Sequence, residues 1–379
     1  MIIFFIILFL NISIKVTFSK FLTFLKNEKY SKGYNDLFNY IQRNEGYINP
    51  KLMPNEISKI NRFIIAKEKI NKNEILLFIP HKTTISKLNN LVISKCREAY
   101  GFDENFDYAC IVYFMTLDKY NLSSIFQPYY NYLPKFNKAD FITNFSEAEI
   151  EMFKDTGITN GIKYYNYFYD QAFSPVKEKL KKFSELKNIK YELIIDEFKY
   201  NYDLVLTRNF GRPDSFYDIN TMVPYLDLIN HSDKNNTYWS YEDNKEGYFL
   251  IAMRDINKNE EITCSYGKYH NSYLYKTYGF VIPGNVYHEN ININLCNENF
   301  DLSVDDIKNK VKNIMKRIIG KNKQNINNVR KCILKDLLEK KKYYLNLKTN
   351  RFSMGIIIKE HLDIIIEFIY EFCHLNNLN

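Results

Sequence analysis

The sequence predicts an α+β fold, in which short strands and long helices occupy separate stretches of the chain. Three observations lead to this prediction. Short runs of strand character occur between about residues 34 and 85 and again between 221 and 281. Long amphipathic stretches fill residues 91–210, and helical spacing returns after Pro283. Because strands and helices do not alternate one by one, we expect neither βαβ units nor a parallel sheet.

The first strand region opens with a helix over DLFNYIQRNEG. The runs FIIAKEKI and EILLFIP follow, bounded by Asn, Lys and Pro, and are predicted as strands. In the second strand region the same pattern recurs in TYWSYED, GYFLIAMRDI and EEITCSYG, which turn residues separate. We therefore expect one strand-containing domain over residues 34–283.

The stretch over residues 91–210 interrupts this domain and predicts helices. AYGFDENFDYACIVYFMTLDKY and SPVKEKLKKFSELKNIKYELIIDEFKYNYDLVLTRNF are its long amphipathic segments. Their length exceeds that of ordinary strands, so the helical assignment is favoured. We interpret this stretch as a helical insertion between the two strand regions.

Residues 284–379 predict an all-α companion domain. Ser303 followed by Asp306 resembles a capping box that opens a helix ending near Gly320. The apolar positions of that helix are Val304, Ile307, Val311, Ile314, Met315 and Ile318. Two further helices are predicted near residues 329–347 and 355–375.

Length and composition indicate a folded protein of two domains, or of one large domain with a smaller companion. The chain has 379 residues, of which 46% are apolar, and this excludes a disordered protein. The net charge of +8, from 52 basic and 44 acidic residues, is a weak signal over this length. We expect no nucleic-acid partner. Asn, Lys and Ile are abundant throughout, so their clusters are discounted as signals.

The N-terminus opens with the apolar run MIIFFIILFL, which Asn11, Ser13 and Lys15 then interrupt. The run falls short of the roughly 18 apolar residues that span a bilayer. Residues 1–19 fit a cleavable signal peptide, although a charged start is missing. An uncleaved anchor and a buried segment are the alternatives. A signal peptide would direct the chain to the secretory pathway, or to an organelle reached through it. Otherwise we expect a cytoplasmic protein, and membrane contact only through an uncleaved anchor.

The cysteines and histidines predict no metal site. The six cysteines lie more than ten residues apart, so no C-x-x-C motif occurs, and we expect six reduced, mostly buried thiols. The six histidines are scattered, without an HExxH motif. The sequence also lacks a phosphate-binding G-x-x-x-x-G-K-[ST] loop, a G-x-S-x-G elbow and a G-x-G-x-x-G turn. Common hydrolase, kinase and dehydrogenase functions are therefore excluded.

Two segments place polar groups inside apolar surroundings. In MVPYLDLINHSDKNN, the residues Asp227, Asn230 and His231 interrupt a run that otherwise has buried character. This pattern is equally typical of a turn after a strand. The segment EEITCSYGKYHNSYLYKTYGFVIP contains Tyr266 before Gly267 and later the triplet Tyr-Gly-Phe. An aromatic core strand followed by a turn would give the same pattern.

Together these segments resemble the SET-domain protein methyltransferases. The closer resemblance is to the branch of the ribulose-bisphosphate carboxylase large-subunit lysine methyltransferase and the actin-histidine methyltransferase. It runs from LFNYIQRNEG through LLFIP, SSIFQPYYNYLPK, TRNF and VPYLDLINHS to EEITCSYGKYHNSYLYKTYGFV. The resemblance implies a SET fold of small β-sheets around a pseudoknot over residues 34–283, with the inserted helices over 91–210. It also implies a helical substrate-binding domain over 284–379.

The resemblance implies S-adenosylmethionine as cofactor and a protein side chain as methyl acceptor. Asn230, His231, Tyr266 and Phe280 would contact the cofactor. Tyr266 would also be the catalytic residue, because its hydroxyl would orient the acceptor nitrogen. A lysine amine has a pKa near 10.4, so an aromatic channel that removes water favours its neutral form.

The substrate side of the site is implied in the same way. Arg208, Arg212, Asp227 and Tyr278 match family positions near the acceptor. Asn271 matches a position that fixes the closing loop and does not touch the substrate. The resemblance thus implies a lysine methyltransferase that acts on a non-histone protein, and we expect a monomer.

One departure from the family leaves alternatives open. Asn61 and Phe63 stand where the family has glycines before the first core strand, and a Cβ there would crowd the cofactor or strain the backbone. A non-catalytic SET scaffold that binds proteins is therefore one alternative. A histidine acceptor is the other, because imidazole and amine use the same aromatic channel.

Overall fold

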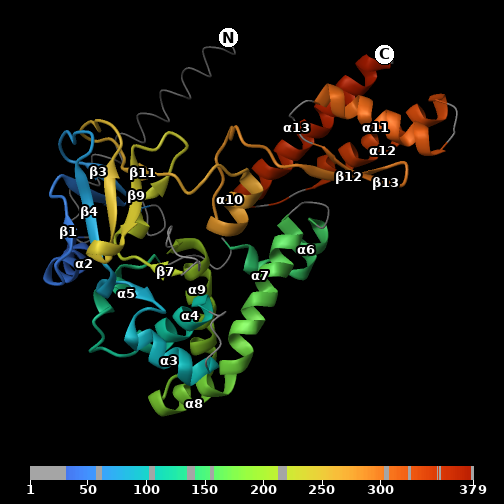
Figure 1. Ribbon diagram of the computed structural model, residues 1–379. Helices are drawn as coiled ribbons and strands as arrows, with labels where there is room; N and C mark the ends of the chain where they lie inside the picture. Colours follow the sequence, from blue (N-terminus) through green and yellow to red (C-terminus); the bar gives the residue numbers. More distant parts are fainter. Residues whose placement is uncertain are drawn as a thin grey trace, which may run out of the picture. The chain divides into compact units, whose positions relative to one another are not determined.

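The structure is a computed structural model, and Figure 1 traces the chain. It describes residues 31–56, 62–101, 107–134, 141–153, 158–211, 220–302, 307–322, 326–347, 349 and 351–376. The contacts divide the chain into two compact units. Unit 1 comprises Met1–Asn137 and Ala172–Tyr266, and unit 2 comprises Lys138–Gln171 and Gly267–Asn379. The domain boundaries predicted near residues 210 and 283 divide the chain along the sequence, whereas these units are discontinuous in sequence. The predicted boundaries stay predictions.

The strands of unit 1 form several small sheets, as expected for an α+β fold (Figure 1). The largest is an antiparallel sheet in the order β1 (Tyr47–Ile48), β4 (Ile75–Pro80), β10 (Gly247–Ala252) and β9 (Thr237–Glu242). Two other antiparallel groups are β2 (Leu52–Glu56) with β3 (Arg62–Ala66), and β5 (Ile85–Ser86) with β7 (Thr221–Met222) and β6 (Asn209–Phe210). A short parallel pair joins β8 (Asn230–His231) to β11 (Thr263–Cys264), where we expected no parallel pairing.

The strand predictions from FIIAKEKI, EILLFIP, TYWSYED, GYFLIAMRDI and EEITCSYG are confirmed by β3, β4, β9, β10 and β11. The β4–β10 pairing joins two distant parts of the sequence, and both strands are mostly buried. Phe78 lies opposite Phe249, and their rings stack at 4.7 Å. Such cross-strand aromatic pairs stabilise a sheet by about 0.2–1 kcal/mol each.

The helices of unit 1 include most of the predicted insertion. They are α2 (Ser31–Arg43), α3 (Asn90–Tyr100), α4 (Asp107–Asp118), α5 (Gln127–Tyr132), α8 (Lys177–Lys187) and α9 (Tyr191–Arg208). Helix α4 is apolar on all sides and is almost completely buried, because α3 and α9 pack against it. The 3₁₀ turns of this unit are η2 (His81–Thr83), η5 (Ser174–Val176), η6 (Leu226–Leu228) and η7 (Asp243–Lys245).

Unit 2 contains helices and one β-hairpin. Its helices are α6 (Glu147–Met152), most of α7 (Ile158–Phe173), α10 (Asn271–Tyr278), α11 (Ile307–Asn322), α12 (Ile326–Asn346) and α13 (Phe352–Leu375), with the 3₁₀ turn η4 (Ile142–Asn144). The hairpin pairs β12 (Ile291–Leu295) with β13 (Glu298–Leu302). The prediction of an all-α C-terminal domain is therefore wrong at residues 291–302. The predicted capping box at Ser303 and Asp306 lies outside the described residues.

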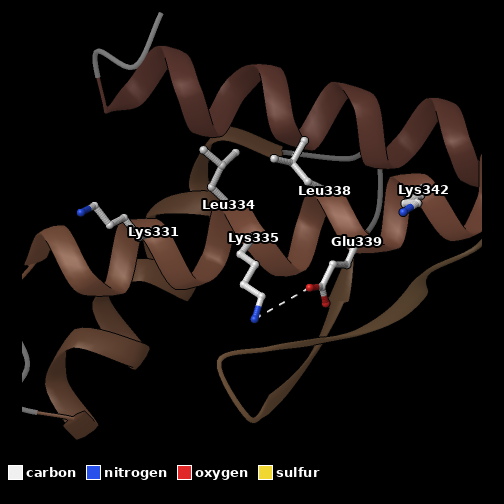
Figure 2. Close-up of a pocket in the computed structure, with 6 residues that line it drawn as sticks. All are labelled: Lys331, Leu334, Lys335, Leu338, Glu339 and Lys342. Atoms are coloured by element: carbon white, nitrogen blue, oxygen red, sulfur yellow. Dashed lines mark ion pairs between the residues drawn. The ribbon is translucent and has the colours of Figure 1, made fainter.

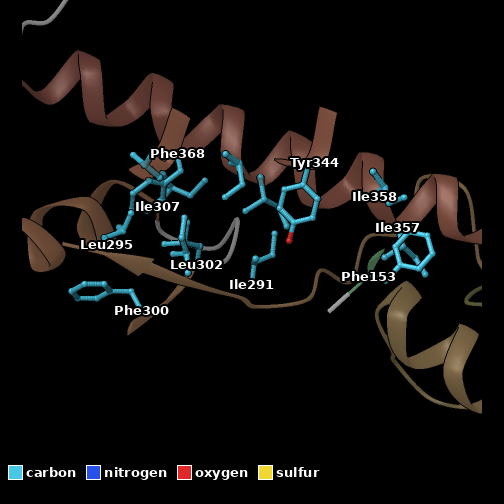
Figure 3. Close-up of a cluster of buried hydrophobic side chains, with 14 of the residues drawn as sticks. Phe153, Ile291, Leu295, Phe300, Leu302, Ile307, Tyr344, Ile357, Ile358 and Phe368 are labelled. Atoms are coloured by element: carbon cyan, nitrogen blue, oxygen red, sulfur yellow. The ribbon is translucent and has the colours of Figure 1, made fainter. Parts of the chain in front are cut away.

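The hairpin follows from the alternation of apolar and Asn residues in ININL, a two-residue period typical of a strand. The abundance of Asn in the whole chain conceals this signal. Ile291, Ile293 and Leu295 are buried, whereas the Asn residues between them are exposed. Both turn residues, Cys296 and Asn297, have positive φ, as a type I′ hairpin turn requires. The apolar face joins α11, α12 and α13 in the hydrophobic core of unit 2, which includes Leu302, Ile307 and Phe368 (Figure 3).

Two disulfides correct the expectation of six reduced thiols. Cys96 of α3 is bonded to Cys110 of α4, with Cα atoms 4.8 Å apart, and Cys296 of the hairpin turn is bonded to Cys332 of α12. Packing of α3 on α4 creates the first pairing, which sequence spacing does not reveal. Cys264 and Cys373 are free thiols.

Within the described part of the chain, no helix has both the length and the apolar character needed to span a membrane. The predicted signal peptide or anchor at residues 1–19 lies outside that part.

Candidate active site

The parallel pair β8–β11 brings together the two polar segments that the sequence singled out. Thr263 lies opposite Asn230, and Cys264 lies opposite His231. The chain from Thr221 to Ile229 is buried throughout, and exposure begins at Asn230 and His231. The polar groups therefore lie where the core of unit 1 meets solvent.

The side chain of Asn230 is held from two sides. Its Nδ2 donates to the main-chain oxygen of Arg62 at 3.0 Å and to Glu261 Oε1 at 2.9 Å. Burial raises the pKa of the Glu261 carboxyl group, and the hydrogen bond from Asn230 opposes this shift. With both Nδ2 contacts made inside the protein, the orientation of the amide is fixed before any ligand arrives.

His231 links the two segments through its imidazole ring. Nδ1 accepts a hydrogen bond from the main-chain N–H of Tyr266 at 2.9 Å, and Nε2 lies 3.3 Å from Asp233 Oδ1. Burial lowers the pKa of His231, while Asp233 acts in the opposite direction. Since Nδ1 accepts, the proton of the neutral ring lies on Nε2, the nitrogen nearer to Asp233. The ring is only 1% exposed, so the exposure of this residue lies in its main chain.

Tyr266 is tied to the same segment by its hydroxyl group. The O–H donates to the main-chain oxygen of Ile229 at 2.8 Å, and the ring lies 5.3 Å from that of His231. A phenol oxygen that donates its proton keeps its lone pairs as acceptors. Tyr266 is therefore a fixed, part-exposed hydrogen-bond acceptor beside Asn230 and His231.

Asp227 has a different environment, although it lies only three residues before Asn230. Its Oδ2 accepts from the Tyr129 hydroxyl at 3.0 Å and lies 3.6 Å from Arg208 Nη1, which also donates to the Asp227 main-chain oxygen at 2.6 Å. The side chain is 1% exposed. Burial raises the pKa of this carboxyl group, whereas Arg208, Arg62 and Tyr129 lower it. Asp227, Tyr129 and Arg208 therefore form a buried network of the kind that stabilises a fold.

The residues predicted to lie on the substrate side are found in different parts of the structure. Asp227 and Arg208 meet in the buried network, whereas Arg212 lies outside the described residues. Tyr278 and Phe280 belong to unit 2, where their rings lie 6.2 Å apart on either side of the left-handed Gly279. The roles assigned to these residues stay predictions.

Asn271 holds the loop after α10, in agreement with the role expected for it. Its Nδ2 donates to the Ile282 main-chain oxygen at 2.8 Å and to Glu360 at 2.6 Å, and its Oδ1 accepts from the Ile282 N–H at 2.7 Å. The side chain is almost fully buried and bonds the loop at both amide atoms. Asn271 therefore fixes the chain that follows Tyr278.

The backbone strain expected at the missing family glycines can be examined at one of the two positions, Phe63, whereas crowding of the cofactor stays a prediction. Phe63 lies in strand β3 opposite Asn55, and it is not among the described residues with positive φ. A side chain there causes no left-handed strain. Asn61 lies outside the described residues.

Sequence reasoning missed three residues that fix the site. Glu261 holds Asn230, Asp233 faces His231, and the main-chain oxygen of Ile229 accepts from Tyr266. No motif pointed to Glu261, because paired Glu residues at the start of a strand are typical of a solvated turn. Asp233 lies in the turn after Asn-His-Ser, where its proximity to His231 could have been expected.

One group of metal-ligand types occurs among the described residues. Cys296, Cys332 and Asp336 place their ligand atoms within 4.8 Å of one another, but the two sulfur atoms form a disulfide. Asp336 Oδ2 accepts from the main-chain N–H of Cys296 at 2.6 Å. The two sulfur atoms are therefore engaged in the disulfide and the carboxylate in the hairpin turn, so this group is not a metal site in the disulfide form.

The fold and the paired segments define a known class of protein. The family model of the SET domain matches residues 61–267, which is more than half of the chain. The chain belongs to the SET-domain family.

Solved structures share this fold across nearly the whole chain. The structure of Rubisco LSMT bound to AdoMet aligns with a TM-score of 0.62, covering 90% of this chain and 91% of that one at 14% identity. The SET domain of LSMT bound to lysine and AdoHcy aligns with a TM-score of 0.60 at 13% identity, covering 91% of each chain. The predicted SET fold with a helical insertion and a C-terminal helical region is thus confirmed, apart from the hairpin.

Two curated relatives are similar in sequence. Ribosomal lysine N-methyltransferase 4 of Saccharomyces cerevisiae is 24% identical over 265 residues, which cover 62% of this chain and 52% of the relative. N-lysine methyltransferase setd6 of Danio rerio is 26% identical over 241 residues, which cover 58% and 50%. The chain therefore spans about half the length of these relatives.

Proposed function

We propose that the protein is an S-adenosylmethionine-dependent lysine N-methyltransferase that acts on a non-histone protein. The observation that carries this proposal is the pairing of β8 with β11, which fixes Asn230, His231 and Tyr266 against one another. The names of the relatives and of the aligned structures support the same activity.

The chemistry of the side chains around Asn230 fits the cofactor. S-adenosylmethionine carries an ammonium group, a carboxylate and an adenine ring, so it needs both donors and acceptors. Asn230 offers the acceptor Oδ1, because its Nδ2 already donates to Arg62 and Glu261. The main chain that reaches solvent at His231 carries both a donor and an acceptor. Phe280 is assigned to the cofactor pocket by the resemblance. When bound, the cofactor would supply a methyl group on a sulfonium: as the neutral amine forms its bond to the methyl carbon, the sulfur–methyl bond breaks, S-adenosylhomocysteine leaves, and the methylated ammonium can release a proton to solvent.

Tyr266 would orient the acceptor. Because its O–H donates to Ile229, its oxygen accepts a hydrogen bond from the substrate N–H and directs the nitrogen lone pair at the methyl carbon. Positioning of this kind supplies a large part of the rate of a two-substrate reaction. The proposal also gives Tyr278 a place in the wall of the acceptor channel. Arg208, Arg212 and Asp227 would act on the substrate side, Arg208 and Asp227 through the network that they form.

A transfer assay tests the proposal. The full chain is incubated with methyl-labelled S-adenosylmethionine and a protein extract, and labelled proteins are hydrolysed to amino acids. We expect labelled methyl-lysine. Labelled methyl-histidine would show that the acceptor is a histidine and not a lysine. Absence of label from every extract tested would favour a non-catalytic scaffold.

A further inference from the structure

The positive charge of the protein is concentrated on two helices of unit 2. Helices α11 and α12 together contain twelve basic and two acidic residues, a formal charge of +10, whereas the whole chain carries +8. The remainder of the chain is therefore slightly acidic. Charge clustered in this way raises the local concentration of an acidic partner and speeds its association.

One face of α12 alternates basic and apolar side chains. Lys331, Lys335, Leu338, Lys342 and Leu345 recur at the three- and four-residue steps of a single helix face, and all are exposed. Leu338 and Leu345 keep 47% and 57% of their surface exposed. Leu334 adds apolar surface beside them. We call these six residues the α12 face.

The α12 face contains a shallow groove. Lys331, Leu334, Lys335, Leu338, Glu339 and Lys342 line it. In the view of Figure 2, Leu334 and Leu338 project along one edge of this face and the Lys335–Glu339 pair along the other, with Lys331 and Lys342 towards the two ends. The surface within the groove is mostly apolar, so a ligand there would need apolar groups as well as charge.

The two acidic residues of α12 do not neutralise this face. Asp336 accepts from the main chain of Cys296 at the hairpin turn, and Glu339 lies 3.8 Å from Lys335 in an exposed i,i+4 pair. Such exposed pairs are worth only about 0.3–0.5 kcal/mol and are readily exchanged for a stronger partner. The face therefore remains basic.

We propose that the α12 face docks an acidic amphipathic segment of a partner protein. Its carboxylates would lie against Lys331, Lys335 and Lys342, and its apolar residues against Leu334, Leu338 and Leu345. Grooves of this kind bind helices through anchors at i, i+4 and i+7. A nucleic acid fits less well, because the face offers leucines where single-stranded RNA needs aromatic rings or arginines to stack on.

A binding titration of the full chain, without cofactor, tests this surface independently of methyl transfer. The probe is a labelled peptide as long as α12, 21 residues, with Leu at i, i+4 and i+7 and Glu at the exposed positions. A peptide of the same composition in scrambled order and a single-stranded RNA are compared with it. We expect the ordered peptide to bind most tightly, and its affinity to fall with salt.

Matched variants separate the α12 face from general charge. Lys331→Glu, Lys335→Glu and Lys342→Glu together should weaken binding roughly tenfold or more, and Leu338→Ser should weaken it without changing charge. The control reverses Lys181, Lys182 and Lys187, three exposed lysines of α8, and should leave the affinity within about twofold. Equal weakening by the control, equal binding of the scrambled peptide, or tighter binding of RNA would each overturn the proposal.

Discussion

Two groups of hydrogen-bonded residues in unit 1 share the segment 227–231 of the sequence and differ in what surrounds them. In the first group Asp227 bonds to Tyr129 and to Arg208 in the interior. In the second group His231 is bonded to Tyr266, and the neighbouring Asn230 is bonded to Arg62 and Glu261. This group lies where the buried run ends and the chain reaches solvent. Both groups contain residues that the family resemblance assigns to the site.

The comparison teaches that the position of a residue in a motif does not determine its role. A buried polar network is costly to break, since each partner left behind is unsatisfied. A network at the border of the core holds polar atoms in fixed directions and still leaves room for a ligand. We therefore expect the first group to govern stability and the second to govern binding and turnover.

The largest effect should come from Asp227→Ala. This change removes the carboxyl group that accepts from Tyr129 and faces Arg208, and breaking a buried charge pair costs about 3–5 kcal/mol. Urea unfolding measures the loss. Asp36→Ala, an exposed carboxyl group on α2, is the control and should stay within about 0.5 kcal/mol. Equal stability of the two variants would show that the buried group is not structural.

Tyr266→Phe should reduce turnover by about 100-fold or more, because it removes the hydroxyl group that the proposed function places beside the acceptor nitrogen. The loss should fall on kcat. Loss of the hydrogen bond to Ile229 should also lower stability by about 0.5–1.5 kcal/mol. Tyr238→Phe, at an exposed tyrosine of β9, should change neither quantity. Methyl transfer at the wild-type rate would remove Tyr266 from the mechanism.

Asn230→Ala should weaken cofactor binding by about 1–3 kcal/mol, the cost of losing a buried polar partner. The fold should persist, because the pairing of β8 with β11 is made by the main chain. Calorimetric titration with S-adenosylmethionine measures the change. Asn257→Ala, at an exposed loop position, is the matched control. If the two variants bind alike, the cofactor site lies elsewhere.

The smallest effect should be a dependence of stability on pH. Burial lowers the pKa of His231 below its ordinary 6.5, so the unfolded chain binds a proton more readily than the folded one. The contribution of the ring is complete above pH 6.5 and is lost as the pH falls through the folded pKa. Thermal unfolding of wild type and His231→Asn from pH 8 to pH 5 measures it. His270, whose pKa burial also lowers, is common to both proteins and cancels in the difference. Parallel curves would contradict the role given to His231.

The sequence predicted the meeting of Asn230, His231 and Tyr266, because their motifs occur in a recognisable order. It did not predict the burial of Asp227, since Tyr129 lies 98 residues away and only tertiary packing brings the two together. The hairpin at residues 291–302 was hidden by asparagines that were interpreted as compositional bias. Glu261 was missed for a related reason, because its role depends on a strand pairing and not on a motif.

The most direct test of this account is the binding of S-adenosylmethionine to the folded full chain at neutral pH, measured by calorimetry for wild type and for two variants. The account predicts one site in the wild type. It also predicts weaker binding in folded Asn230→Ala, whose stability falls by about 1–3 kcal/mol because Arg62 and Glu261 lose a donor. For the fraction of Asp227→Ala that remains folded, it predicts an unchanged intrinsic affinity. Absence of binding to the folded wild type, or loss of affinity in folded Asp227→Ala with none in Asn230→Ala, would contradict it.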